Sequence, residues 1–386
     1  MSRVFDFDSV PDRRGTASVK WDVKANELPM WVADMDFGVA PEITEAINSR
    51  AAHPVFGYTD INSEWRDAYV RWWRDRHSLE IDGRDLVFVT GVVPAISSAV
   101  RKFTSPGENV VIMTPVYNIF YNSILNNGRN VVERPLLRKD GGYSVDWEGF
   151  ERDVCDPQTT LFILCNPHNP VGKIWDRETL ARIGETCKAN GVTVISDEIH
   201  CDVVTPGKSY VPFASVSDTC REISVTCIAP TKAFNIAGIQ TAAVFSRNGF
   251  LRHKIWRQIN TDECGEPNVF AVPAAVAAFR YGGDWLDSMN AYVYENKKFV
   301  GEYLAKSSPG IGYDIADATY LAWLDVSRYT SDSQKFCDAL RRETGLFVSN
   351  GKQYGKTGET FIRVNLATSR ANVEDGMERL CKFVNK

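Results

Sequence analysis

Three apolar runs, each followed by polar residues, decide the predicted fold: 161-LFILC-165 before Asn166-Pro-His-Asn169-Pro-Val-Gly172, 192-VTVIS-196 before Asp197-Glu-Ile-His200, and 223-ISVTCIA-229 before Pro230-Thr231-Lys232. Each run is continuously apolar, which is typical of strands covered on both faces in a parallel sheet. A helical pattern over 176–190 separates the first run from the second. Strands that alternate with helices in this way predict an α/β fold.

The same alternation extends in both directions along the chain. Strands are predicted at 85–89, 109–113, 130–134, 160–165, 192–196, 223–228 and 241–245, and helices at 41–52, 62–77 and 92–103. We therefore expect a mostly parallel sheet with helices on both faces. From about residue 267 the pattern changes to long helices, followed by two strands and a last helix: 267–280, 284–306, 320–325, 360–366 and 372–384. This predicts an N-terminal arm that contributes to the small domain (1–40), a large domain (41–280) and a small α+β domain (281–386).

The composition indicates the setting in which the protein works. The 386 residues carry a formal net charge of −5 without long runs of one sign, so neither a nucleic-acid nor a membrane partner is expected. The nine cysteines are scattered and form no CxxC pair, which fits free thiols in a reducing cytosol. The N-terminus MSRVFDFDSV is too polar for a signal peptide, and no apolar run approaches the ~18 residues that span a bilayer. We expect a cytoplasmic protein.

Polar side chains gather where the predicted strands end. Asn169, Asp197 and Lys232 follow the three central runs, Tyr117 follows the strand at 109–113, and Thr90-Gly91-Val92-Val93 joins the strand at 85–89 to a helix. Ligands of open α/β sheets bind beyond the carboxyl ends of the strands. We therefore expect these residues to meet at one rim of the sheet.

These residue types suit a flat, phosphorylated pyridine aldehyde. Lysine supplies the amine for a Schiff base, and a carboxylate keeps a pyridine nitrogen protonated so that the ring can accept electrons from a carbanion. An amide can donate to a ring hydroxyl, an aromatic ring can stack on the pyridine, and N–H groups at a helix start bind phosphate. Taken singly, Lys232 is more often a surface lysine, Asp197 a helix cap, Asn169 a turn residue and Tyr117 a core residue. Their order at successive strand ends favours a binding site.

No metal site is expected. Asp34 and Asp36 are two carboxylates without further ligands nearby in the sequence, a pattern more typical of a turn or a solvated face. His168 lies in a turn bounded by prolines and has no evident metal-binding partner.

Seven segments, in this order, carry a resemblance to one group of enzymes: MWVADMDF (30–37), FGYT (56–59), TGVVPA (90–95), PVY (115–117), CNPHNPVG (165–172), DEIHCD (197–202) and TKAFNIAG (231–238). The chain resembles fold-type I pyridoxal-phosphate (PLP) enzymes of the class I/II aminotransferase superfamily. Within that superfamily it is most similar to the cystathionine β-lyase, or C–S lyase, subgroup, to which a maltose-regulon modulator and cystalysin belong. The resemblance covers essentially the whole chain, and it implies a PLP cofactor, a small amino-acid substrate and a homodimer.

The resemblance also implies roles for individual residues. Lys232 would form the Schiff base and then move the Cα proton, Asp197 would pair with the pyridinium nitrogen, and Asn169 would pair with the ring oxygen. Tyr117 would stack on the ring, and His200 stands near the ring oxygen where many relatives have tyrosine. The backbone at Gly91, Val92 and Val93, together with Thr231, would hold the phosphate. Tyr58 would reach the phosphate of the neighbouring subunit. Arg363, with Arg370 as a nearby alternative, would bind the substrate α-carboxylate.

The reaction is indicated by the subgroup, because lyases and aminotransferases share their ring chemistry. Gln240 stands where many aminotransferases have a phosphate-binding arginine, and Ala229 lacks a hydroxyl common at its position; both features are more typical of the lyase subgroup. We therefore expect a C–S β-lyase that converts cystathionine or a related cysteine S-conjugate to a thiol, pyruvate and ammonia. An aminotransferase is the alternative within this fold. A regulatory protein-binding role, as in a maltose-regulon modulator, is the alternative of another class.

Overall fold

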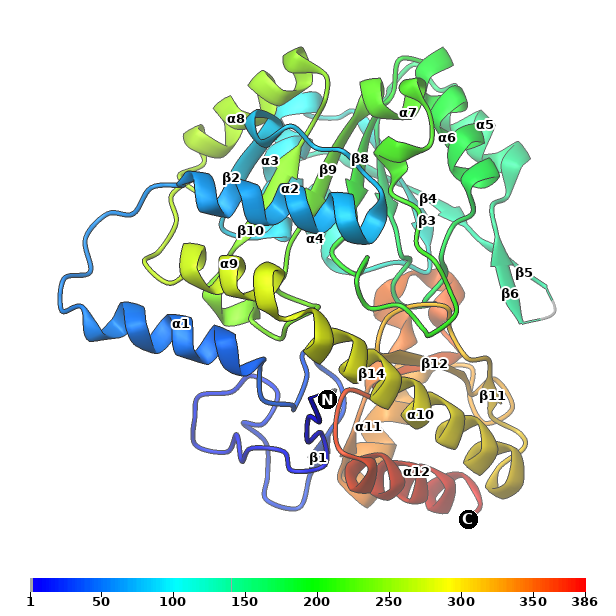
Figure 1. Ribbon diagram of the computed structural model, residues 1–386. Helices are drawn as coiled ribbons and strands as arrows, with labels where there is room; N and C mark the ends of the chain where they lie inside the picture. Colours follow the sequence, from blue (N-terminus) through cyan, green and yellow to red (C-terminus); the bar gives the residue numbers. More distant parts are fainter. Residues whose placement is uncertain (1–2, 140) are drawn as a thin grey trace.

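A seven-stranded sheet forms the centre of the structure (Figure 1). The computed structural model describes residues 3–139 and 141–386. The strand order is β2-β10-β9-β8-β7-β3-β4, and all strands are parallel except β10, which pairs antiparallel with β2 and β9. The strands are β2 (Leu86–Val89), β3 (Asn109–Thr114), β4 (Asn130–Pro135), β7 (Thr159–Cys165), β8 (Thr193–Asp197), β9 (Ser224–Ile228) and β10 (Ala242–Phe245). The seven predicted strands are thus confirmed, each with its ends shifted by no more than one residue.

Helices cover both faces of this sheet, which explains why its inner strands carry apolar side chains on both faces. In β3, Val110 and Ile112 belong to the core under α3 (Val92–Phe103) and α8 (Gly249–Thr261). Val111 and Met113, between them in sequence, belong to the core under α5 (Trp147–Val154), α6 (Arg177–Ala189) and α7 (Asp218–Ile223). Successive side chains of a strand point to opposite faces, so both sets must be apolar.

Other helices extend the large core. α2 (Ser63–His77) packs against α9 (Ala271–Tyr281), and α1 (Pro41–Ala52) also contacts α9. α9 begins later than the predicted residue 267 because Asn268 Oδ1 accepts a hydrogen bond from the Phe270 N–H at 3.0 Å, which makes a turn of the preceding residues. α4 (Ile119–Leu125) and the hairpin of β5 (Leu137–Lys139) and β6 (Gly142–Ser144) were not predicted. Among the described helices, none has the length and apolarity needed to cross a membrane.

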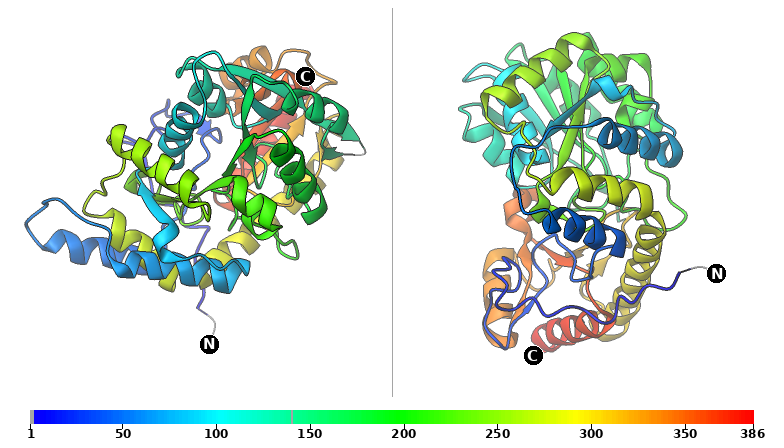
Figure 2. Two further views of the ribbon diagram at one scale, coloured as in Figure 1. Left: turned by 90° about the horizontal axis from the view of Figure 1, so that it is seen from above. Right: turned by 60° about the vertical axis from the view of Figure 1, so that its left-hand side comes forward.

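A second, four-stranded sheet lies in the C-terminal third of the chain. Its order is β11 (Gly312–Tyr313), β12 (Leu321–Asp325), β15 (Phe361–Asn365) and β14 (Ser349–Asn350), all antiparallel. Residues of α10 (Gly283–Ser307), α11 (Ser333–Thr344) and α12 (Arg370–Val384) share its core. The N-terminal β1 (Leu28–Pro29) pairs parallel with β13 (Leu346–Phe347), so N-terminal and C-terminal segments lie side by side (Figure 2). The domain boundaries given above stay a prediction.

Candidate active site

The carboxyl ends of β7, β8 and β9 lie side by side in the sheet. Asp197, the last residue of β8, is level with Cys165 of β7 on one side and with Cys227 of β9 on the other. The loops that carry Asn169 and Lys232 therefore leave the sheet on either side of Asp197. This register brings the amide, the acid and the amine to one rim.

The Asp197 carboxylate is buried, with 4% of the residue exposed. Its Oδ1 accepts a hydrogen bond from the Ile199 N–H at 3.1 Å. This is a turn contact, since no described helix begins at this point of the chain, and the helix-cap interpretation is wrong. Burial raises the pKa of Asp197 to about 7, because water no longer stabilises the charged form. A cation beside the carboxylate would lower that pKa again, so Asp197 is suited to pair with a buried positive charge.

The Lys232 amine points to the N-terminal segment. Its Nζ donates to the carbonyl of Ala33 at 2.5 Å. Burial lowers the pKa of Lys232 to about 8, and the nearby carboxylate of Asp34 opposes this shift. Near pH 8 much of the amine is therefore neutral, as a nucleophile or a proton acceptor must be.

Arg363 of β15 connects the second sheet to this rim. Its Nη1 donates to Asn169 Oδ1 at 3.2 Å, and its Nη2 donates to the Trp31 carbonyl at 3.0 Å. The guanidinium lies 4.8 Å from the centroid of the Tyr354 ring, and only 5% of the residue is exposed. These partners are neutral, so the buried positive charge can attract a carboxylate.

The partly buried Tyr117 and the buried His200 complete the rim. Burial, with the Asp197 charge as a smaller cause, raises the pKa of Tyr117 to about 12. His200 is 3% exposed, and burial lowers the pKa of its imidazole to about 3. The Nδ1 of His200 has no hydrogen-bond partner among the described residues. A neutral imidazole with an unpaired buried nitrogen is suited to bind a polar atom of a ligand.

The N-terminus of α3 is open to an anion. The helix starts at Val92, after Gly91, and no side chain caps the N–H groups of its first turn. These groups, which include that of Val93, and the positive end of the helix dipole attract phosphate. α3 contacts β8 and β9, so it packs beside the strands that precede the site, and Thr231 adds a nearly buried hydroxyl next to Lys232.

Tyr58 is the predicted site residue that the structure leaves outside the rim. It lies in the connection between α1 and α2, which extends away from the body of the molecule (Figure 1), and its side chain is fully exposed. Tyr58 lines a hollow of about 680 Å³ together with Gln240. Tyr58 therefore lies among exposed residues, apart from the side chains that gather at the rim.

Backbone carbonyls of residues 30–37, here named the N-terminal strap, form a wall of the site that sequence reasoning missed. The MWVADMDF motif marked this segment but indicated no role for it. Side chains from distant parts of the chain donate to the strap carbonyls: Lys232, Asn235, Tyr320, Arg363 and Asn365. Every residue has a backbone carbonyl, whatever its side chain, so no signal in the sequence could have shown these contacts.

Ion pairs connect the strap to the residues that precede it in the sequence. Asp36 pairs with Lys20 at 2.9 Å and accepts a hydrogen bond from Trp21 Nε1 at 2.8 Å. Asp34 pairs with Arg13 at 2.7 Å. Asp36 is 3% exposed, so the prediction of a solvated face is wrong for it. Its partners lie well upstream in the sequence, where a local pattern could not connect them.

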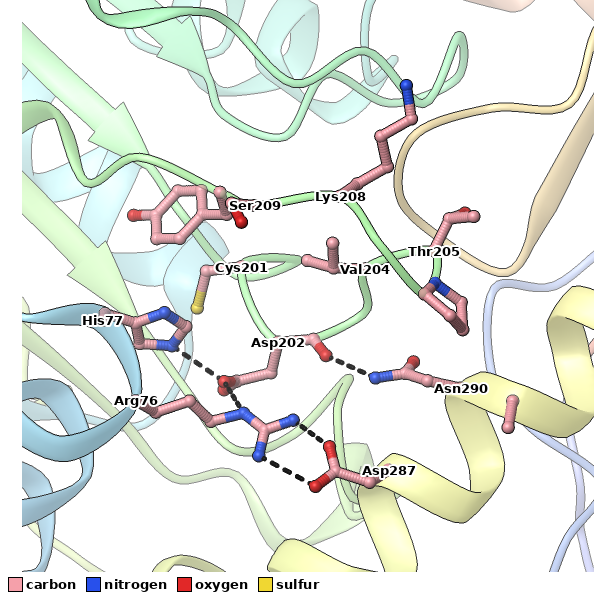
Figure 3. A pocket seen from close by; sticks show the side chains of 13 residues that line it. Arg76, His77, Cys201, Asp202, Val204, Thr205, Lys208, Ser209, Asp287 and Asn290 are labelled. Carbon is pink, nitrogen blue, oxygen red and sulfur yellow. Dashed lines mark hydrogen bonds and ion pairs between the residues drawn. The ribbon is translucent and has the colours of Figure 1, made fainter.

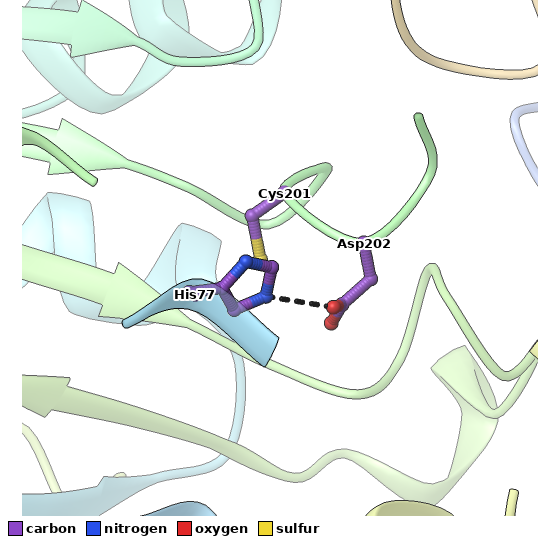
Figure 4. Close-up of side chains that lie close together, drawn as sticks. All are labelled: His77, Cys201 and Asp202. Carbon is purple, nitrogen blue, oxygen red and sulfur yellow. Dashed lines mark hydrogen bonds and ion pairs between the residues drawn. The ribbon is translucent and has the colours of Figure 1, made fainter. Parts of the chain in front are cut away.

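A cavity of about 490 Å³ lies beside the end of the DEIHCD segment, 197–202 (Figure 3). Figure 4 shows three of its residues, His77, Cys201 and Asp202, whose potential ligand atoms lie within 4.8 Å of one another. His77 Nε2 lies 2.8 Å from the Asp202 carboxylate, and the Arg76 guanidinium lies 3.6 Å from the same group. The arginine charge opposes a metal ion here. We interpret this cluster as a structural contact that joins α2 to the DEIHCD segment.

The residues at the rim fit a flat, phosphorylated pyridine. The structure provides a partly neutral amine at Lys232, a buried carboxylate at Asp197 and an uncapped helix start at Gly91. Two buried nitrogens, His200 Nδ1 and Arg363 Nε, lack partners among the described residues. Buried polar atoms are normally paired, so unpaired ones facing a shared rim indicate a site for a polar ligand.

Comparison with known proteins identifies the family. The sequence profile described as "Aminotransferase class I and II" matches residues 27–380. The chain belongs to this family. Cystathionine beta-lyase PatB of Bacillus subtilis is 43% identical over 382 residues, which are 97% of this chain and 98% of the relative. Protein MalY of Escherichia coli is 33% identical over 99% of both chains. The structure of cystalysin from Treponema denticola, which contains PLP, matches with a TM-score of 0.96 at 31% identity over 99% of both chains. These likenesses confirm the predicted family and fold.

Proposed function

We propose that this protein is a PLP-dependent C–S β-lyase that converts cystathionine or a related cysteine S-conjugate to a thiol, pyruvate and ammonia. The observation that carries this proposal is the 43% identity, over nearly the whole chain, with a cystathionine β-lyase. The partly buried amine of Lys232 and the buried carboxylate of Asp197 agree with it, because they are the groups that PLP chemistry requires.

The rim residues take distinct parts in holding PLP. Lys232 would bind the aldehyde carbon of PLP covalently, and Asp197 would hold the pyridine nitrogen. Asn169 and His200 would hold the ring oxygen, and Tyr117 would contact the ring. When bound, the cofactor supplies an electron sink for the negative charge formed at the substrate Cα.

The phosphate belongs at the start of α3 in this proposal. The backbone at Gly91, Val92 and Val93 and the hydroxyl of Thr231 would hold it. We propose a homodimer in which the partner subunit's Tyr58 reaches the same phosphate. The exposure of Tyr58 in a projecting connection supports this arrangement. The scattered free cysteines support a cytoplasmic location.

Arg363 and Lys232 perform the steps that belong to the chain itself. Arg363 binds the substrate α-carboxylate with two parallel N–H groups, and this orients the Cα–H bond toward Lys232. The Lys232 amine, once free, takes the Cα proton; its lowered pKa keeps part of it neutral for this step. The Cβ–S bond then breaks as a Cα=Cβ double bond forms, the sulfur leaves with the electron pair of the broken bond and takes up the proton that Lys232 removed from Cα, and water hydrolyses the released aminoacrylate to pyruvate and ammonia.

The deciding experiment separates a lyase from an aminotransferase. Purified protein with PLP is incubated with cystathionine, and pyruvate is measured with and without an added keto acid. The proposal expects pyruvate without the keto acid, because elimination needs no amino-group acceptor. Alanine has no leaving group at Cβ, so any slow reaction with it should transfer its amino group. Rapid turnover of an amino acid with a keto acid, without pyruvate from cystathionine alone, would establish the aminotransferase alternative.

A further inference from the structure

Two donors meet at one carbonyl oxygen of the N-terminal strap. Lys232 Nζ donates to the Ala33 carbonyl at 2.5 Å, and the Tyr320 hydroxyl donates to the same oxygen at 2.9 Å. A carbonyl oxygen has two lone pairs, so these two bonds use its full capacity. The direction of the Ala33 carbonyl, and with it the position of the amine, therefore depends on Tyr320.

Tyr320 is held firmly where it makes this contact. The residue has no exposed surface, and its ring lies 6.2 Å from that of His200 at a steep angle. Burial raises the pKa of Tyr320, so the hydroxyl keeps its proton and stays a donor at neutral pH. The backbone that leads into Tyr320 is also unusual. The preceding residue, Thr319, has a φ of 66°, a conformation that is costly for a β-branched residue.

The strained turn at Thr319 is tied to the segment that follows His200. The Thr319 N–H donates to the Val203 carbonyl at 2.7 Å, and the Thr319 hydroxyl accepts from the Leu321 N–H at 3.2 Å. These bonds compensate for the unfavourable backbone and direct Tyr320 to the strap. Backbone strain of this kind is retained mainly where geometry serves a function.

We propose that Tyr320 is a positioning residue that fixes the Lys232 amine through the Ala33 carbonyl. The inference rests on the proposed function and extends it, since Lys232 needs a fixed place whenever the substrate has displaced it from the cofactor. A flexible lysine side chain gains no orientation of its own. The Ala33 carbonyl, held by Tyr320, supplies a directional acceptor that keeps the amine near the Cα proton.

Tyr320→Phe tests this idea, with Tyr313→Phe as the matched control. Tyr313 belongs to the neighbouring strand β11, and its buried hydroxyl has no partner among the described residues. We expect Tyr320→Phe to lower kcat for cystathionine about tenfold, the effect of one lost hydrogen bond, with KM nearly unchanged. The kinetic isotope effect with α-deuterated cystathionine should rise, because proton removal becomes slower relative to the other steps. Values equal to those of Tyr313→Phe would overturn the proposal.

A second measurement uses protein freed of cofactor and needs no turnover. Acetic anhydride is added, and acetylation of Lys232 is followed by peptide mass spectrometry. We expect Lys232 to be acetylated several-fold faster in Tyr320→Phe than in Tyr313→Phe, because the Ala33 carbonyl that binds its amine is no longer held in place by the Tyr320 hydroxyl. Equal rates would refute the positioning role even if the enzyme is a lyase. Faster labelling in a protein that forms no pyruvate would instead refute the lyase proposal alone.

Discussion

Replacing Arg363 with methionine should strongly reduce turnover of cystathionine. Arg363 is 5% exposed, and its Nη1 and Nη2 are already aligned by Asn169 and the Trp31 carbonyl. A substrate carboxylate would gain two charge-assisted hydrogen bonds from this group, each worth about 1.5–3 kcal/mol. Their loss amounts to roughly 3–4 kcal/mol after allowing for non-additivity, and at about 1.4 kcal/mol per factor of ten kcat/KM should fall on the order of 10²–10³-fold.

The assay is pyruvate release from cystathionine over a range of substrate concentrations. Arg370→Met is the control, because Arg370 begins α12 and its guanidinium lies over the Phe299 ring, 4.7 Å from the centroid. It should keep kcat/KM within about threefold of the wild type, because its guanidinium packs on Phe299 and makes no hydrogen bond to the strap or to Asn169. The visible absorption band of lysine-bound PLP should persist in both variants, which separates substrate binding from cofactor loss. If Arg363→Met keeps kcat/KM within tenfold while Arg370→Met does not, Arg370 is the carboxylate anchor.

Four further outcomes test other parts of the site and the fold. Lys232→Ala should abolish or shift the visible band of the purified protein; an unchanged spectrum would remove Lys232 from its role. Asp197→Ala should retain some PLP but lose activity by on the order of 10²-fold or more, because the charge that develops on the ring is no longer stabilised; near-normal turnover would point to another acid. Mixing inactive Lys232→Ala with inactive Tyr58→Ala should restore part of the activity after subunit exchange, and no recovery despite proven exchange would place Tyr58 in its own subunit's site. Burial lowers the pKa of Lys297 to about 7 from 10.5. Between these two pH values the unfolded chain binds more protons than the folded chain, so the free energy of unfolding should rise with pH. Urea unfolding at pH 7 and 9 should show a smaller rise in Lys297→Met than in wild type.

The fold was predictable where local sequence reflects burial. β7 and β8 are each buried at every position but one because helices cover both faces of the sheet, and their central residues are apolar for that reason. Short elements gave no comparable signal. β1 and β13 have two residues each and exist through their pairing with one another across most of the chain, and the start of α9 depends on a turn made by the Asn268 side chain. Such elements are set by tertiary contacts, which local propensity does not contain.

The site likewise has a part that the sequence predicts and a part that it does not. The predictable part consists of side chains at strand ends, and the other part consists of main-chain groups from a distant segment. Asn169, Asp197 and Lys232 could be placed together from the sequence because parallel strands bring their carboxyl ends to one rim. The strap could not, since it takes part through carbonyl oxygens that every residue type possesses. Its position rests on Arg13 and Lys20, whose pairing with acids at the strap required the folded chain.

The strap also affects the geometry of the site, because it contacts both Lys232, beside one sheet, and Arg363, in the other. Lys232, which follows the seven-stranded sheet, bonds to the Ala33 carbonyl, and Arg363, which belongs to the four-stranded sheet, bonds to the Trp31 carbonyl. Only one residue separates these two acceptors along the chain. The distance between the Lys232 amine and the Arg363 guanidinium is therefore set by a short piece of bent backbone as well as by the packing of the two sheets. A change that loosens the strap should weaken substrate orientation and proton removal together, even though none of its side chains belongs to the predicted catalytic set.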